Sequence, residues 1–217
     1  MTDFHDDLGF IDFHDSTLRG VYFCASQGVA CCSLAVYLGD CAERVDRSIV
    51  WSAMDSLFGS IDLVELADNA CSGNVQSCRF SEVPGLFNLS LTGGMVEFQG
   101  GELSSFECPA ANSVDVNPDF SGEIHSSGIS DIDFDSLSLD AVALSVEDRE
   151  CRLTFVNRYD PSSFAPVVIL FSSVTSCVVK LSALVGVRAR TGGSAGFYDD
   201  RVRFYFGNNF IEIVSDS

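Results

Sequence analysis

A nine-residue stretch near the start of this chain has a counterpart about 120 residues later. The stretch comprises residues 13–21, and its counterpart comprises residues 134–142. Each opens with a phenylalanine and a short polar step that contains Asp and Ser, and each then enters an apolar run. The spacing is too long for a solenoid array, so it predicts that one structural unit is used twice.

Further segments recur in the same order. Residues 48–56 align with residues 168–176, and residues 86–98 align with residues 201–213, where Glu97 matches Glu212. Residues 73–80 and 188–198 occupy equivalent places between these segments. The matching runs are rich in Val, Phe and Ser, and Lys180 is the only lysine, which favours strands over helices.

Most of the local patterns indicate strands and hairpins. A Gly-containing break at residues 26–28 predicts a hairpin between two apolar runs, and Gly or Asn residues predict hairpins within residues 86–98 and 201–213. Residues 61–66 are expected to form a short strand. Between Asp40 and Gly59, an Asp-x-x-Glu capping pattern favours a helix, whereas the alignment with residues 168–176 favours a strand at residues 49–51, and whether a helix is present there stays open.

The predicted fold is therefore mostly β, with little helix and with an internally duplicated antiparallel β unit. The boundaries expected are residues 1–106 for the first repeat, 107–130 for a linker or crossing loop with Pro109 and Pro118, and 131–217 for the second repeat. Two such repeats can form one sandwich-like body or two lobes, and the sequence leaves both possibilities open.

The charge of the chain is concentrated. The formal net charge is −19, and no Lys or Arg lies between Arg79 and Arg149. Such a field repels phosphate backbones and anionic lipid, so we expect no nucleic-acid or membrane partner. It attracts a basic protein. The predicted partner-binding residues are the acids in and just after the linker: Glu102, Glu107, Asp115, Asp119, Glu123, Asp131, Asp133, Asp135, Asp140, Glu147 and Asp148.

The cysteines and the N-terminal residues predict a reducing compartment. The chain has nine cysteines without a Cys-x-x-Cys pair, and several lie within apolar runs, as buried free thiols do. The first residues are acidic and lack the pattern of a secretion signal. We therefore expect a cytoplasmic protein.

Two motifs resemble sites of chemistry. His14, Asp15 and Ser16 are the residue types of a hydrolase triad, but neighbours on a strand point to opposite faces, so a turn-stabilising role is favoured for Asp15 and Ser16. Asp131, Asp133 and Asp135 have the spacing of calcium ligands, but a calcium loop needs Gly at position 136 and an acid at position 142, and the alternation with Ile132 and Phe134 favours a strand. We predict no catalytic residue, no metal site and no cofactor.

The opening of the first repeat, Phe13-His14-Asp15-Ser16, resembles the early strand of small bacterial β proteins that begin with Phe-His-Asp-Ser or Phe-His-Asp-Ala. Several of those proteins are similar to immunity proteins of interbacterial toxin systems. The second repeat departs from the pattern at Asp135. The resemblance implies a cytosolic, non-enzymatic protein that binds a partner.

Three functions follow from these patterns. The first is an immunity-type inhibitor that neutralises a basic toxin or effector domain through the acidic residues named above. The alternative is a small-molecule or carbohydrate-binding β module with a groove between the repeats, lined by Trp51, Phe204 and Phe206. The third is a hydrolase that uses convergent carboxylates. The identity and activity of the partner, and the oligomeric state, stay open.

Overall fold

The computed structural model is a β sandwich of two eight-stranded sheets. It describes residues 11–25, 27–38, 42–81, 85–107, 123–125, 129, 132–159, 166–182, 193–198 and 200–216. Both sheets are antiparallel, apart from the parallel pair that β9 makes with β12. The predicted mostly-β class with little helix is confirmed, and the sandwich-like arrangement is the one observed.

Sheet A has the order β8-β3-β2-β1-β10-β11-β12-β9. Its strands are β1 (Ile11–Cys24), β2 (Val29–Leu38), β3 (Val45–Ser52), β8 (Glu102–Glu107), β9 (Glu123–His125), β10 (Leu137–Ser145), β11 (Glu150–Asn157) and β12 (Val167–Phe171). A 3-10 turn, η2 (Phe134–Ser136), precedes β10.

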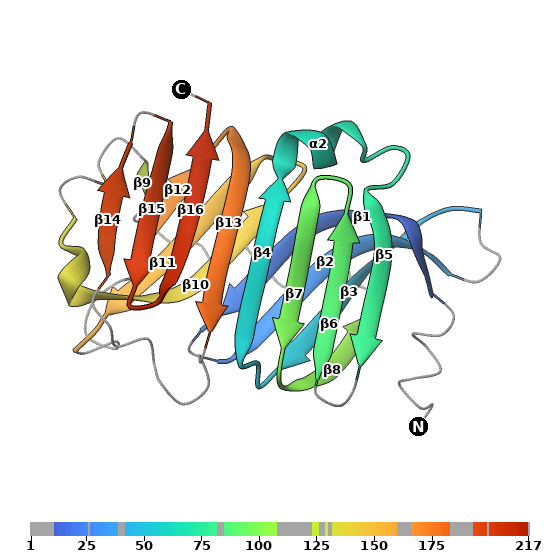
Figure 1. The fold of residues 1–217 in the computed structure, drawn as a ribbon, viewed down its shortest axis with the longest axis horizontal. Coiled ribbons are helices and arrows are strands. Elements are labelled where there is room, and N and C mark those ends of the chain that lie inside the picture. The colour runs from blue at the N-terminus through green and yellow to red at the C-terminus, as the bar shows by residue number, and fades with distance from the viewer. Residues whose placement is uncertain are drawn as a thin grey trace.

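Sheet B has the order β14-β15-β16-β13-β4-β7-β6-β5 and forms the front layer in Figure 1. Its strands are β4 (Ser56–Asp62), β5 (Val75–Ser81), β6 (Leu86–Leu91), β7 (Gly94–Gln99), β13 (Val174–Ser182), β14 (Ser194–Phe197), β15 (Arg201–Phe206) and β16 (Asn209–Ser215). One short helix, α2 (Leu63–Asp68), follows β4.

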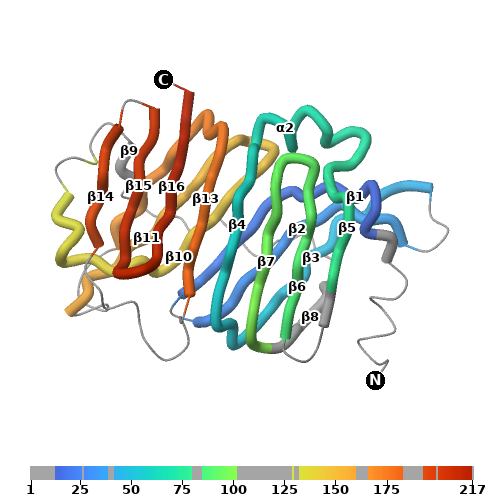
Figure 2. Tube along the Cα trace, in the orientation of Figure 1, coloured from blue at the N-terminus to red at the C-terminus, as the bar shows by residue number. Residues whose placement is uncertain are grey.

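The two repeats share both sheets instead of forming separate lobes. In Figure 2 the strands of the first repeat, from blue to green, lie beside those of the second, from yellow to red. They meet at two antiparallel pairs, β1 with β10 in sheet A and β4 with β13 in sheet B, which we call the seam. Each half follows the same path, because β1 to β7 correspond in order to β10 to β16.

The pairing across the seam is symmetric. Tyr22 pairs with Ala143 and Gly59 pairs with Val179, and in both pairs the partners are equivalent positions of the two repeats. An approximate two-fold axis therefore runs through both sheets at these pairs. The predicted boundaries at residues 106 and 130 remain a prediction, and the predicted linker contributes strand β9.

Local irregularities recur at equivalent positions. A β-bulge interrupts the register between Leu18 and Gly20 in the first repeat and between Leu139 and Ala141 in the second. Ala53 and Ser173, which begin the crossings from sheet A to sheet B, both have φ of 54°. Such features are retained when a unit is copied whole, so they support duplication of a complete β unit.

Strand alternation builds the core. In β4, Leu57, Gly59 and Ile61 are buried between the sheets, whereas Phe58 and Ser60 point outward. Each repeat has its own aromatic cluster in the core, with Trp51, Phe87 and Phe98 in the first and Phe134, Phe155, Phe171 and Phe204 in the second. Aliphatic side chains join the two clusters at the seam.

Several local predictions are tested by the strands. The hairpins β1–β2, β6–β7 and β15–β16 are confirmed. The strand predicted at residues 49–51 is part of β3, and the described residues between 42 and 59 contain no helix. The strand predicted at residues 61–66 is wrong, because β4 ends at Asp62 and α2 begins at Leu63. The Asp62 side chain caps this helix by accepting a 2.9 Å hydrogen bond from the backbone N–H of Glu65.

Candidate functional site

The predicted acidic surface is only partly visible in the structure. Asp115, Asp119 and Asp131 lie outside the described residues, and only the backbone is described for Glu102, Glu107 and Glu123. Asp133, Asp135, Glu147 and Asp148 are exposed, and Asp140 is half-buried. The exposed acids occur in two groups, one at each end of β10.

The first group surrounds the turn between β10 and β11. The guanidinium of Arg19, which lies in the β1 bulge, is 3.8 Å from Glu147 and 4.0 Å from Asp46 of β3. Asp148 accepts a 2.7 Å hydrogen bond from the hydroxyl of Ser145. Two exposed carboxylates thus share one arginine, and the exposed Asp148 adds a third negative charge, so the group carries a net negative charge. Asp46 was missed in the sequence because it lies outside the interval that lacks basic residues.

The second group precedes β10. The Asp133 side chain accepts a 3.2 Å hydrogen bond from the backbone N–H of Asp135 and so caps η2. The strand expected at these residues is wrong, because residues 134–136 form the 3-10 turn η2. Phe134 still points into the core, where it contacts Phe155 and Phe204. The nine residues of β10 span about 30 Å, so Asp133 and Asp135 lie far from the first group.

Asp140 occupies the β10 bulge beside Tyr22. Burial, followed by the neighbouring Cys24 and then Asp140, raises the pKa of the Tyr22 hydroxyl to about 12. The phenol is therefore neutral at physiological pH. This seam position in sheet A combines a neutral phenol with one half-buried carboxylate and makes no acid and base pair.

The triad-like motif is not assembled as a catalytic site. His14 and Asp15 are exposed neighbours, with His14 Nδ1 3.1 Å from Asp15 Oδ2, whereas Ser16 is fully buried. Asp15 has φ of 63° within an irregular part of β1, between Asp12 and Thr17. The backbone carbonyl of Ser16 accepts a hydrogen bond from the N–H of Asn74. The motif thus forms the irregular part of β1 that accepts a hydrogen bond from Asn74, the residue before β5.

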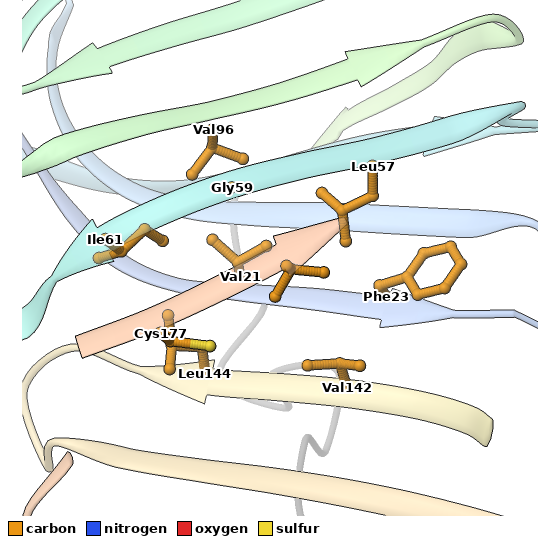
Figure 3. Close-up of a pocket in the computed structure, with 10 residues that line it drawn as sticks. Val21, Phe23, Leu57, Gly59, Ile61, Val96, Val142, Leu144 and Cys177 are labelled. Atoms are coloured by element: carbon orange, nitrogen blue, oxygen red, sulfur yellow. The ribbon is translucent and has the colours of Figure 1, made fainter. Parts of the chain in front are cut away.

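The groove predicted between the repeats is wrong for the residues named. Trp51, Phe204 and Phe206 are all buried in the core. The space at the seam is a cavity of about 20 Å³, shown in Figure 3, which is enough for about one water molecule. Equivalent residues of the two repeats line it in pairs: Val21 with Val142, Phe23 with Leu144, Leu57 with Cys177, and Gly59 with Val179. A cavity this small and apolar does not hold a substrate.

The outer face of sheet B carries a group of side chains that the sequence reading missed. Arg203 forms an ion pair with Glu212 on the neighbouring strand, and its guanidinium lies 5.1 Å from the centre of the Phe210 ring. The Lys180 ammonium lies 5.9 Å from the centre of the Phe58 ring. Only the strand register shows that these residues are neighbours, because Phe58 and Lys180 are far apart in sequence.

One continuous row of paired residues crosses six strands of this face: Tyr205, Phe210, Lys180, Phe58, Glu97 and Asn88. The match between Glu97 and Glu212 has a structural counterpart here, since Glu97 accepts a 2.8 Å hydrogen bond from Asn88 at the position equivalent to the Arg203–Glu212 pair.

Within the described part of the chain, no group of three or more His, Cys, Asp or Glu side chains is arranged to hold a metal ion. None of the described helices is long and apolar enough to cross a membrane. Comparisons of the chain with protein-family models, with curated proteins and with solved structures found no match.

Proposed function

We propose that the protein is a non-catalytic, immunity-type inhibitor that binds a basic toxin or effector domain through its acidic surface. The observation that carries the proposal is the excess of exposed carboxylates around β10, in a stretch without a basic residue between Arg79 and Arg149. Complementary charge accelerates the encounter with such a partner and selects against partners of the wrong sign.

The size of the acidic region fits this role. A standard protein interface covers about 800 Å² on each partner, which is about 30 Å across and comparable to the length of β10. The group of Asp46, Glu147 and Asp148 forms one end of the proposed contact, where carboxylates converge from β3 and from the turn between β10 and β11. Asp133 and Asp135 lie at its other end, about 30 Å away.

The test begins with affinity capture of the tagged protein from its native cells and identification of captured basic proteins by mass spectrometry. The isolated partner is assayed for loss of its activity when the purified protein is added. We expect inhibition at a stoichiometric ratio, and a partner that retains full activity when bound would contradict the inhibitory role.

Charge reversal then locates the surface. Asp46→Lys with Glu147→Lys should slow association at least ten-fold at low salt and reduce its salt dependence, because both reversals convert local attraction into repulsion. The matched control is Glu65→Lys with Asp68→Lys, which changes the net charge equally on the exposed side of α2. Equal slowing by both variants would show that net charge, and not this surface, determines binding.

A further inference from the structure

The outer face of sheet B has an apolar centre on the seam. Phe58 and Met95 are 43% and 37% exposed, and Val178 and Phe210 are half-buried beside them. These four side chains come from the adjacent strands β7, β4, β13 and β16. Figure 1 shows no helix or strand in front of this layer. Lys180 and Ser60 lie between them in the strand register. Exposed apolar side chains gathered on adjacent strands are typical of an interaction surface.

The arrangement of the rings argues against sugar stacking. A carbohydrate stacks on open aromatic faces, but cationic groups already lie over these rings. Arg203 lies over Phe210 and Tyr205, and Lys180 lies over Phe58. The cations therefore occupy the ring faces on which a sugar would stack.

The charges of this face differ between its two halves. On the strands of the second repeat, Lys180, Arg201 and Arg203 point outward. Arg201 is paired with the neighbouring Asp200 and Arg203 with Glu212, so the excess positive charge comes from Lys180. On the strands of the first repeat, Asp62 and Glu97 outnumber Arg79. Among the described residues, no carboxylate lies within ion-pair distance of Lys180. One half thus has an excess of one positive charge, at Lys180, and the other has an excess of negative charge.

A surface with an apolar centre and opposite charges on its two halves is complementary to itself. A two-fold axis parallel to the strands would place the basic half of one copy over the acidic half of another. Eight strands spaced about 4.8 Å apart and about 24 Å long present about 800 Å², which equals the area that each partner contributes to a standard interface. We propose that the outer face of sheet B binds a second copy of this chain in a two-fold symmetric dimer.

In this arrangement β13 of one copy lies over β4 of the other. Lys180 then faces Phe58 of the second copy and lies next to Glu97, which faces Phe210. Met95 lies opposite Glu212, one residue pair further along the strands. The acidic surface around β10 belongs to sheet A and stays accessible. The dimer would therefore present two copies of that surface on opposite sides.

Sedimentation equilibrium of the full chain at 150 mM salt, from about 1 to 100 μM, tests the proposal, because screening at this salt limits repulsion between the acidic chains to about 8 Å. We expect the mass of two chains at the upper concentrations. Phe58→Ser should raise the dissociation constant at least ten-fold. Tyr159→Ser removes an exposed aromatic side chain from the end of β11, away from this face, and should leave the dissociation constant unchanged.

A mixing experiment tests the orientation. Lys180→Glu and Glu97→Lys should each weaken the homodimer, because each places like charges opposite one another. An equimolar mixture of the two variants should recover a heterodimer, since both contacts are then between opposite charges. Circular dichroism melts check that each variant is folded. A single-chain mass at 100 μM, dimerisation that Phe58→Ser leaves unchanged, or a mixture that stays monomeric would each overturn the proposal.

Discussion

Adding one methyl group at Gly59 tests the packing on the approximate two-fold axis. Gly59 points into the seam cavity, where the equivalent residue of the second repeat is Val179. A Cβ atom at Gly59 would have the Met95 carbonyl oxygen, 3.8 Å away, as its only close neighbour. The cavity volume of about 20 Å³ can therefore accept the methyl group without displacing a side chain.

The expected gain has two parts. Burial of one methyl group contributes about 0.8 kcal/mol, and the lower conformational entropy of the unfolded chain contributes about 0.4–1 kcal/mol. Gly59→Ala should thus increase the free energy of unfolding by about 1–2 kcal/mol, which corresponds to about 3–6 °C in Tm for a domain of this size. Urea denaturation and a thermal melt measure the two quantities.

Gly94→Ala provides the matched control in the adjacent strand. Its Cβ would overlap the carbonyl oxygen of Ser60, and Gly94 has φ of 143°, which alanine rarely adopts. We expect Gly94→Ala to lower the stability by more than Gly59→Ala raises it. A Gly59→Ala protein that is no more stable than the original would refute the cavity-filling argument.

Three further predictions concern buried groups. Asn74→Ala should lower the free energy of unfolding, measured in urea, by about 2–4 kcal/mol, because it leaves the N–H of Leu18 and the carbonyl of Leu66 unpaired in the interior. A loss below 1 kcal/mol would contradict this. A thiol-specific reagent at pH 8 should label Cys71 well before Cys78, as followed by peptide mapping. Cys71 is exposed, whereas burial raises the pKa of the Cys78 thiol to about 12. Equal labelling rates would be inconsistent with this difference. The free energy of unfolding should fall between pH 10 and pH 12, because the Tyr22 phenol ionises in the unfolded chain at a lower pH than in the folded protein. Tyr22→Phe should reduce this fall, as measured by denaturation at a series of pH values. An unchanged dependence of the unfolding free energy on pH would exclude Tyr22 as its cause.

The architecture was predictable because its signals are periodic and local. The repeated segments predicted the duplication, and the Gly and Asn turns predicted the hairpins β6–β7 and β15–β16. The decision between helix and strand at residues 49–51 was correct because the second copy supplied an independent reading of the same segment.

The errors arise where two segments share a local signal. Asp40 with Glu43 and Asp62 with Glu65 are both Asp-x-x-Glu pairs. Asp40 lies outside the described residues, and Asp62 caps α2, where Leu63 and Leu66 become buried. The Ile61–Leu66 run is apolar enough for a strand, and tertiary burial of those two leucines decides the outcome. The aromatics assigned to a groove, such as Trp51, are large enough to fill the core, which is where they lie.

The sheet B face was not predictable from one-dimensional patterns. Lys180 meets Phe58 only because β13 pairs with β4 across the seam. That pairing depends on the register between the two repeats. An alternating strand reveals which side chains point outward, but it does not reveal which strands are adjacent.

The seam also bears on how the chain folds. Gly20 pairs with Ser145 and Ser56 pairs with Ser182, so each seam contact closes a loop of more than one hundred residues, whereas the hairpins close loops of a few residues. Because loop closure costs entropy before contacts form, hairpins are expected to form early and the seam late. Before the seam forms, β1 and β4 each have one unpaired edge. A newly made first repeat can therefore pair with a neighbouring chain until the second repeat has been synthesised.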